Sequence, residues 1–155
     1  MTRLTPHRMI LPVMLALAAP AYAAAPAPSL ATSQQAASAA VAACQGTPIA
    51  VAVIDSSGLP RLVQVSDGAL ALFGQFAVRK AATALRYGKP SAVVRDEATT
   101  NPELAEKLKN DPALIGFGGG LPFAGGAIAV AGAPSQDTDQ RCAEAGLALL
   151  AMPKP

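Results

Sequence analysis

The longest apolar run lies near the start of the chain and is not amphipathic. A cationic stretch containing Arg3 and Arg8 precedes the run from Met9 to Ala19, and Ala21-Tyr22-Ala23 follows it. This order is typical of a secretory signal with an A-x-A-type cleavage site. The run is shorter than the ~20 apolar residues that span a bilayer. We therefore expect residues 1–23 to be removed on export, with a periplasmic or secreted product and no stable membrane insertion.

Beyond the signal, helical and strand-like patterns follow one another along the chain. Helical spacing predicts a first helix that is capped by Ser29 or Thr32 and runs to about Cys44. Further helices are predicted over 69–87, 91–97, 101–109 and 135–150, with Asn101 at the capped start of the fourth. Apolar segments predict strands over 49–54 and 127–130. Asp55-Ser56-Ser57-Gly58 predicts a hairpin turn, after which 60–65 is predicted to pair with 49–54 as an antiparallel strand. The Gly-rich segment 114–122 is expected to be extended, and the Ala/Pro-rich residues 24–28 to form a disordered leader.

This order of elements predicts an α+β fold, in which helices pack on a central antiparallel β-sheet. Residues 29–152 have about the length of one domain and show no internal repeat.

Charge narrows the range of partners. The whole chain has 12 Lys and Arg against 10 Asp and Glu, and two of the cations, Arg3 and Arg8, belong to the predicted signal. The remaining domain is formally neutral, so we expect no nucleic-acid partner.

Cys44 and Cys142 are the two cysteines of the chain and lack C-x-x-C spacing. In an oxidising compartment such a pair favours a structural disulfide. Closing so long a loop would stabilise the fold by on the order of 4 kcal/mol. Two buried free thiols are the alternative interpretation.

The single histidine, His7, lies in the predicted signal. The mature chain therefore has no histidine for a catalytic triad, for general-base catalysis or for ligation of a metal or haem. The cysteines also lack zinc-ligand spacing. We predict no catalytic residues, and an enzyme is not the favoured interpretation.

Three groups of residues are candidates for binding. Residues 116–120 are Gly-rich but lack a phosphate-loop pattern, so close approach of another element is favoured over an anion-binding nest of amides. Asp55 and Asp67 lie at opposite ends of the hairpin and are predicted turn or cap residues. Lys80 lies on a predicted helix with Arg79, where such charges mark either a solvated face or a partner for ligand carboxylates.

Taken in order, several short stretches resemble the GlcG/HbpS-like haem-binding family over about residues 47–150. The matching stretches are Val51-Ala52-Val53-Ile54-Asp55 with Gly58, Asp67-Gly68-Ala69, Ala77 with Lys80-Ala81 and Thr83-Ala84, Gly119-Gly120-Leu121-Pro122, and Ala127 to Pro134 followed by Asp139, Cys142, Ala145 and Gly146. The resemblance implies a central antiparallel sheet flanked by helices, symmetric homo-oligomers, and a role in haem binding, sensing or stress response.

The resemblance also implies a ligand near Asp67, Lys80, Gly119 and Gly120. The chain departs from the family pattern in having Val65-Ser66 where Arg-Met is common, and several residues fewer between Pro122 and Ala127. Because the mature chain has no histidine, haem iron would be held by Tyr87, by Met152, by a free cysteine, or by no strong ligand. Of these we single out Tyr87 as the candidate.

Two functions follow as hypotheses. The first is an exported protein that binds or senses haem or another tetrapyrrole. The alternative is an oligomeric protein that binds a small organic acid, such as a hydroxy acid, through Lys80 and backbone amides without haem.

Overall fold

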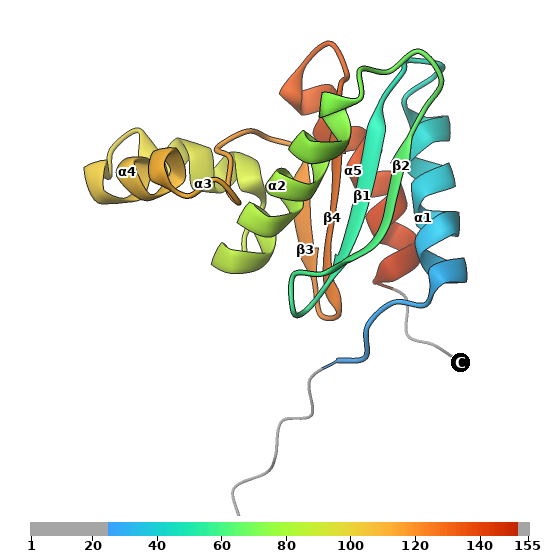
Figure 1. Ribbon diagram of the computed structural model, residues 1–155, viewed down its shortest axis with the longest axis horizontal. Helices are drawn as coiled ribbons and strands as arrows, with labels where there is room; N and C mark the ends of the chain where they lie inside the picture. Colours follow the sequence, from blue (N-terminus) through green and yellow to red (C-terminus); the bar gives the residue numbers. More distant parts are fainter. Residues whose placement is uncertain (1–24, 152–155) are drawn as a thin grey trace, which may run out of the picture.

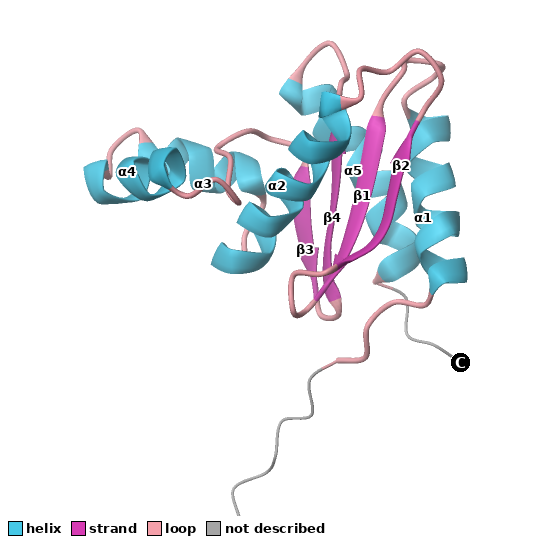
Figure 2. Ribbon diagram, in the orientation of Figure 1, coloured by secondary structure: helices cyan, strands magenta, loops and turns pink. Residues whose placement is uncertain are grey.

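Helices cover both faces of a four-stranded sheet in the computed structural model, which describes residues 25–151 (Figure 1). The predicted signal over 1–23 and the candidate ligand Met152 lie outside the described residues. The helices are α1 (Leu30–Ala43), α2 (Leu72–Tyr87), α3 (Ser91–Ala98), α4 (Pro102–Asn110) and α5 (Gln136–Leu150), and the strands are β1 (Ala50–Asp55), β2 (Pro60–Val65), β3 (Gly120–Phe123) and β4 (Gly126–Ala131) (Figure 2). The predicted α+β class, with its antiparallel sheet, is confirmed.

The strands lie in the order β2-β1-β4-β3, and every neighbouring pair is antiparallel. Val53 pairs with Leu62 on one side and with Ile128 on the other. The Gly-rich segment contributes β3 only at its end, and Ala124 and Gly125 alone separate β3 from β4. Pro122 fits in β3 because this strand lies at the edge of the sheet, where a missing N–H breaks no ladder.

The two central strands present different side chains to the two faces of the sheet. Branched residues, among them Val51, Val53 and Ile128, face α1 and α5 and form the larger core cluster. The opposite face carries mainly alanine, which lets α2 approach the sheet through its own buried Ala77 and Ala81. Both faces are therefore covered, and all residues of β1 and β4 are buried.

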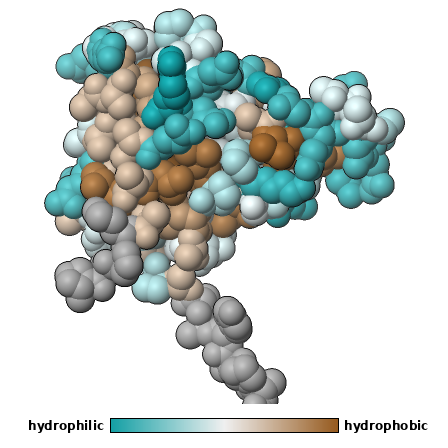
Figure 3. All heavy atoms as spheres, turned by 180° about the vertical axis from the view of Figure 1, so that it is seen from behind, coloured by the Kyte–Doolittle hydropathy of each residue, from teal (hydrophilic) through white to brown (hydrophobic). Residues whose placement is uncertain are grey.

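Helices α3 and α4 form an arm that extends from the body beyond α2 (Figure 1). Leu104 is the buried residue of α4, which packs mainly on α3. Seen from behind, the arm is mostly hydrophilic, whereas apolar atoms gather over the middle of the body (Figure 3). The arm contacts the body through α3, which packs on α2 and β3.

A disulfide joins Cys44 at the C-terminal end of α1 to Cys142 in α5, with a Cα–Cα distance of 5.5 Å. This confirms the predicted pairing and excludes the alternative of two free thiols. Before α1, residues 25–28 have no helix or strand, and Pro28 is buried.

Candidate functional site

Lys80 lies on the buried face of α2, although lysine normally marks a solvated face. It shares this face with Ala77 and Ala84, which are three and four positions away and therefore lie one helical turn to either side. The residue is 3% exposed. Its position places an ammonium group among β4, the Gly-rich segment and the start of α5.

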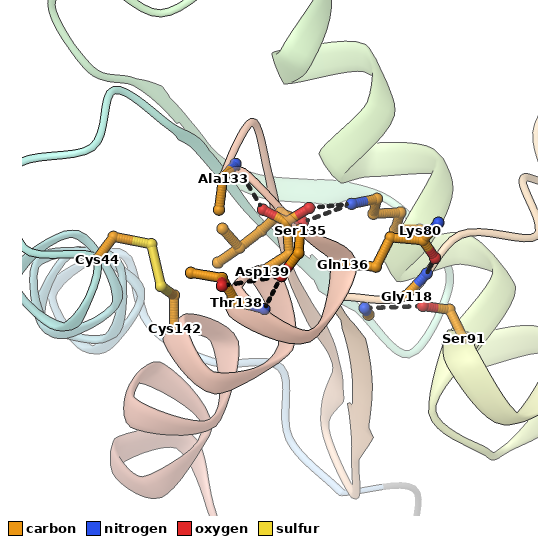
Figure 4. A network of polar contacts seen from close by, with 12 residues as sticks. Cys44, Lys80, Ser91, Gly118, Ala133, Ser135, Gln136, Thr138, Asp139 and Cys142 are labelled. Atoms are coloured by element: carbon orange, nitrogen blue, oxygen red, sulfur yellow. Dashed lines mark hydrogen bonds and ion pairs between the residues drawn. A yellow bond between two sulfur atoms is a disulfide. The ribbon is translucent and has the colours of Figure 1, made fainter.

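The ammonium group of Lys80 is held by two acceptors. Nζ donates to Oδ2 of Asp139 at 2.6 Å and to the carbonyl oxygen of Val130 at 3.1 Å. In Figure 4, Lys80 from α2 and Asp139 from α5 point toward each other. A lysine ammonium has three N–H donors, so one N–H remains for another partner.

Asp139 is fixed by the way α5 begins. Ser135 caps the helix by accepting the N–H of Thr138, which places Asp139 in the first turn. Its second oxygen, Oδ1, accepts the N–H of Ala133 at 2.9 Å. A carboxylate is favoured at this end of a helix because the unpaired N–H groups carry partial positive charge.

Burial shifts the pKa of both members of this ion pair toward the neutral forms. Loss of solvation lowers the pKa of Lys80, and the charge and hydrogen bond of Asp139 oppose that shift. Loss of solvation raises the pKa of Asp139, and Lys80 opposes that shift in turn. Each residue therefore depends on the other to keep its charge in the interior.

Gly119 and Gly120 leave the space in which the pair sits. Gly119 has a φ of +112°, and a Cβ there would lie 2.7 Å from the carbonyl oxygen of Val130 and 2.8 Å from Cβ of Asp139. A Cβ on Gly120 would collide with the backbone of Lys80. Close approach of another element is thus the confirmed reason for these glycines.

Gln136 connects the Gly-rich segment to the arm and to α5. Its Oε1 accepts the N–H of Gly118 and an N–H of Arg95, both at 2.6 Å. Ser91 of α3 accepts the N–H of Gly120 at 2.8 Å. The arm therefore braces the segment that covers Lys80.

A cavity of about 380 Å³ opens beside the pair. Its polar lining comes from Lys80, Asp139, Ser135 and Gln136, and its apolar lining from Phe73, Phe76, Phe117 and residues 131–134. This mixture of aromatic walls with a few converging polar groups is typical of a small-molecule site.

The structure brings together three of the five predicted binding residues, namely Lys80, Gly119 and Gly120. Asp67 is exposed in the connection between β2 and α2. Tyr87 is half-buried at the C-terminal end of α2 and does not line the cavity beside Lys80. Asp139 was not among the predicted site residues, because no local pattern places it beside Lys80.

The sequence profile described as "Haem degrading protein HbpS-like" matches residues 29–148. The chain belongs to the HbpS-like family. A double mutant of HbpS from Streptomyces reticuli is 33% identical, with 90% of this chain and 99% of that one covered and a TM-score of 0.73.

Two further solved structures share the HbpS-like fold. The ORFY protein of Klebsiella pneumoniae is 24% identical, with 90% of this chain and 100% of that one covered and a TM-score of 0.77. The structure described as a PduOC:heme complex is 23% identical, with 79% and 94% covered and a TM-score of 0.69. No curated protein matches the chain significantly in sequence.

The description of the HbpS-like family implies haem, so we asked which side chains of this chain could ligate haem iron. Residues 25–151 contain neither histidine nor methionine, and both cysteines are joined in the disulfide. Tyr87 is the one tyrosine in this part of the chain. Of the usual haem-iron ligands, none therefore lines the cavity beside Lys80, and these cavity walls do not fit axial ligation.

Two other properties bear on ligands and location. Across residues 25–151, no cluster of three or more His, Cys, Asp or Glu side chains is placed to hold a metal ion. In the same part of the chain, no helix has both the length and the apolar character needed to cross a bilayer.

Proposed function

We propose that this chain is an exported protein that binds or senses haem or another tetrapyrrole. The observation that carries the proposal is membership of the HbpS-like family across residues 29–148. The fold shared with the PduOC:heme complex supports it. Haem degradation, which the family description names, is not part of this proposal.

In this proposal the tetrapyrrole is held chiefly by apolar contact. A second cavity, of about 780 Å³, is lined largely by apolar residues that include Phe123, Leu147 and Leu150. Such walls suit the face of a porphyrin, whose ring is flat and apolar. Tyr87 does not line this cavity, so the iron of a tetrapyrrole bound there would have no strong protein ligand among the described residues, and ligation by Tyr87 would require a different place of binding.

Export is supported by the disulfide. Bonds such as Cys44–Cys142 form and persist in oxidising compartments and are rare in the cytosol. Together with the predicted signal over 1–23, this favours a periplasmic or secreted protein.

Homo-oligomer formation is supported by the exposed edge strand β2. Val63 and Val65 are 43% and 42% exposed, and Leu70 and Leu72, which follow in sequence, are 58% and 43% exposed. Apolar side chains gathered along an unpaired edge are a common site of association between protein chains.

The deciding experiment is a titration of the mature protein, from residue 24 onward, with haemin while the Soret band is recorded. Saturable binding with a spectral shift is expected, and absence of both would contradict the proposal. Tyr87→Phe keeps the ring and removes the oxygen ligand, so a changed Soret band in this variant would identify tyrosinate ligation. Thr100→Val, which removes an exposed hydroxyl from the arm, serves as the control.

The alternative function is binding of a small organic acid without haem. Burial of Lys80 beside a cavity of about 380 Å³ favours it specifically. A ligand that binds only the folded state must raise the melting temperature. A panel of organic acids, with both hydroxy acids and aromatic acids in it, that leaves the melting temperature unchanged would contradict it.

A further inference from the structure

We infer that the cavity beside Lys80 binds the carboxylate of a ligand whose body is apolar or aromatic. The inference deepens the organic-acid alternative, on which it rests, by assigning the ligand class and the residues that recognise it. It requires no iron. Two sources share this chemistry, namely a free aromatic acid and a propionate arm of a tetrapyrrole.

Hydrogen-bond donors remain unused at the cavity. Two of the three N–H groups of Lys80 have acceptors, which leaves one. Gln136 uses Oε1 for two donors, and this fixes the amide orientation and leaves Nε2 without a partner among the described residues. The backbone N–H of Gln136 also has no acceptor among the described residues, as expected for the first turn of α5.

Each side-chain acceptor at the same place already accepts at least one hydrogen bond. Both oxygens of Asp139 accept hydrogen bonds, from Lys80 and from Ala133. Oε1 of Gln136 accepts two, and Oγ of Ser135 accepts the N–H of Thr138. The donors without a partner, one of them on a charged ammonium group, favour a ligand group that only accepts, and a carboxylate is such a group.

The apolar walls define the rest of the ligand. Three of the four phenylalanines in the chain, Phe73, Phe76 and Phe117, line this cavity. Phe117 is 44% exposed, so core packing does not account for its position at the rim. Aromatic rings favour an apolar or aromatic partner over a small hydroxy acid, whose hydroxyl groups would lose water at these walls.

The first arm of the test compares 3-phenylpropionate with glycolate by isothermal titration calorimetry. The phenyl acid is expected to bind at least about tenfold more tightly, because it buries a ring that glycolate lacks. Equal affinities for the two acids would overturn the inference. It would also be overturned if 3-phenylpropionate did not bind and haemin binding did not depend on the carboxylates of haemin.

The second arm uses variants that keep the fold. Gln136→Glu retains the acceptor for Gly118 and Arg95 but replaces the free donor by negative charge, so the affinity for 3-phenylpropionate should fall by about tenfold or more. Gln35→Glu adds the same charge on the exposed side of α1 and should leave it unchanged. Phe117→Ala should weaken binding, whereas Leu59→Ala, at an exposed turn, should not.

The third arm separates the two sources and the two proposals. If the carboxylate belongs to a tetrapyrrole, haemin should bind more tightly than its dimethyl ester, and Gln136→Glu should weaken only the free acid form. If it belongs to a free acid, 3-phenylpropionate binding should respond to the variant while haemin does not. The contrary result is that haemin binds equally well as the dimethyl ester and to the Gln136→Glu variant, while 3-phenylpropionate does not bind at all. That result would refute this inference but leave the proposed haem function intact.

Discussion

Nζ of Lys80 lies 2.6 Å from Oδ2 of Asp139, although 59 positions separate the two residues in the chain. Their side chains are 4% and 6% exposed. The contact links α2 to α5, which cover opposite faces of the sheet, and it forms one wall of the cavity.

Removing the cation from this pair should destabilise the protein strongly. Lys80→Met leaves Asp139 charged and buried without its partner, so the free energy of unfolding is expected to fall by about 3–5 kcal/mol. Urea denaturation would measure the loss. Lys89→Met breaks the exposed pair between Lys89 and Glu97 and should cost no more than about 1 kcal/mol. Equal losses would show that Lys80 is not held as described.

Adding a methyl group at Gly119 should disturb the same wall. The new Cβ would lie 2.7 Å from the carbonyl oxygen of Val130, in a backbone conformation that favours glycine. We expect Gly119→Ala to cost about 3 kcal/mol or more. Gly46 has a φ of +80° with no atom within 4 Å of such a Cβ, so Gly46→Ala should cost only about 1 kcal/mol. Similar melting temperatures for the two variants would contradict the close approach.

Reduction of the disulfide should lower the free energy of unfolding relative to that of the oxidised protein. The bond between Cys44 and Cys142 spans 98 positions, and release of so long a loop is expected to cost about 4 kcal/mol. Denaturation with and without dithiothreitol would measure it. Cys44→Ser with Cys142→Ser should behave like the reduced protein and become insensitive to the reductant. A midpoint that reduction does not move would contradict the prediction.

The turn between β1 and β2 should make stability depend on pH. The hydroxyl of Ser57, above all, lowers the pKa of Asp55 below its ordinary value of 3.8, and the backbone N–H of Leu59 adds to the effect. A depressed folded pKa gives stability that is present above 3.8 and is lost as pH falls through that lower value. Asp55→Asn should therefore be less stable than the wild type near neutral pH.

That difference should shrink as the pH falls below 3.8 toward the lower folded-state pKa of Asp55, because the carboxyl group is protonated first in the unfolded chain and then in the folded protein. Urea midpoints across an acid series would measure it. A gap that stays constant with pH would show that the charge of Asp55 does not contribute.

Local patterns predicted most of the architecture but not the site. The apolar runs that became β1 and β4, and the capping residues Ser29 and Asn101, have physical effects within a few residues of themselves, so they could be recognised in the sequence. The strand β3 was less visible, because glycine and Pro122 are poor strand formers and the edge position tolerates them.

The burial of Lys80 could not be foreseen in the same way. It depends on the small face that β4 turns toward α2 and on Asp139, which arrives with another helix. Such contacts between distant segments are set by tertiary packing and leave no periodic signal in the chain. Asp67 was placed near the ligand by resemblance alone, and the structure leaves it exposed and outside the cavity beside Lys80.

Residues 25–28 and 149–151 line the same apolar cavity, so the two ends of the described chain emerge side by side. A short linker between them would permit circular permutation, with new termini opened at Thr99 and Thr100 in the arm. In such a permutant Cys44 and Cys142 would close a much shorter loop without any change in the folded contacts. The entropic contribution of the disulfide should then decrease, because it depends on how the chain is connected and not on where the sulfur atoms lie.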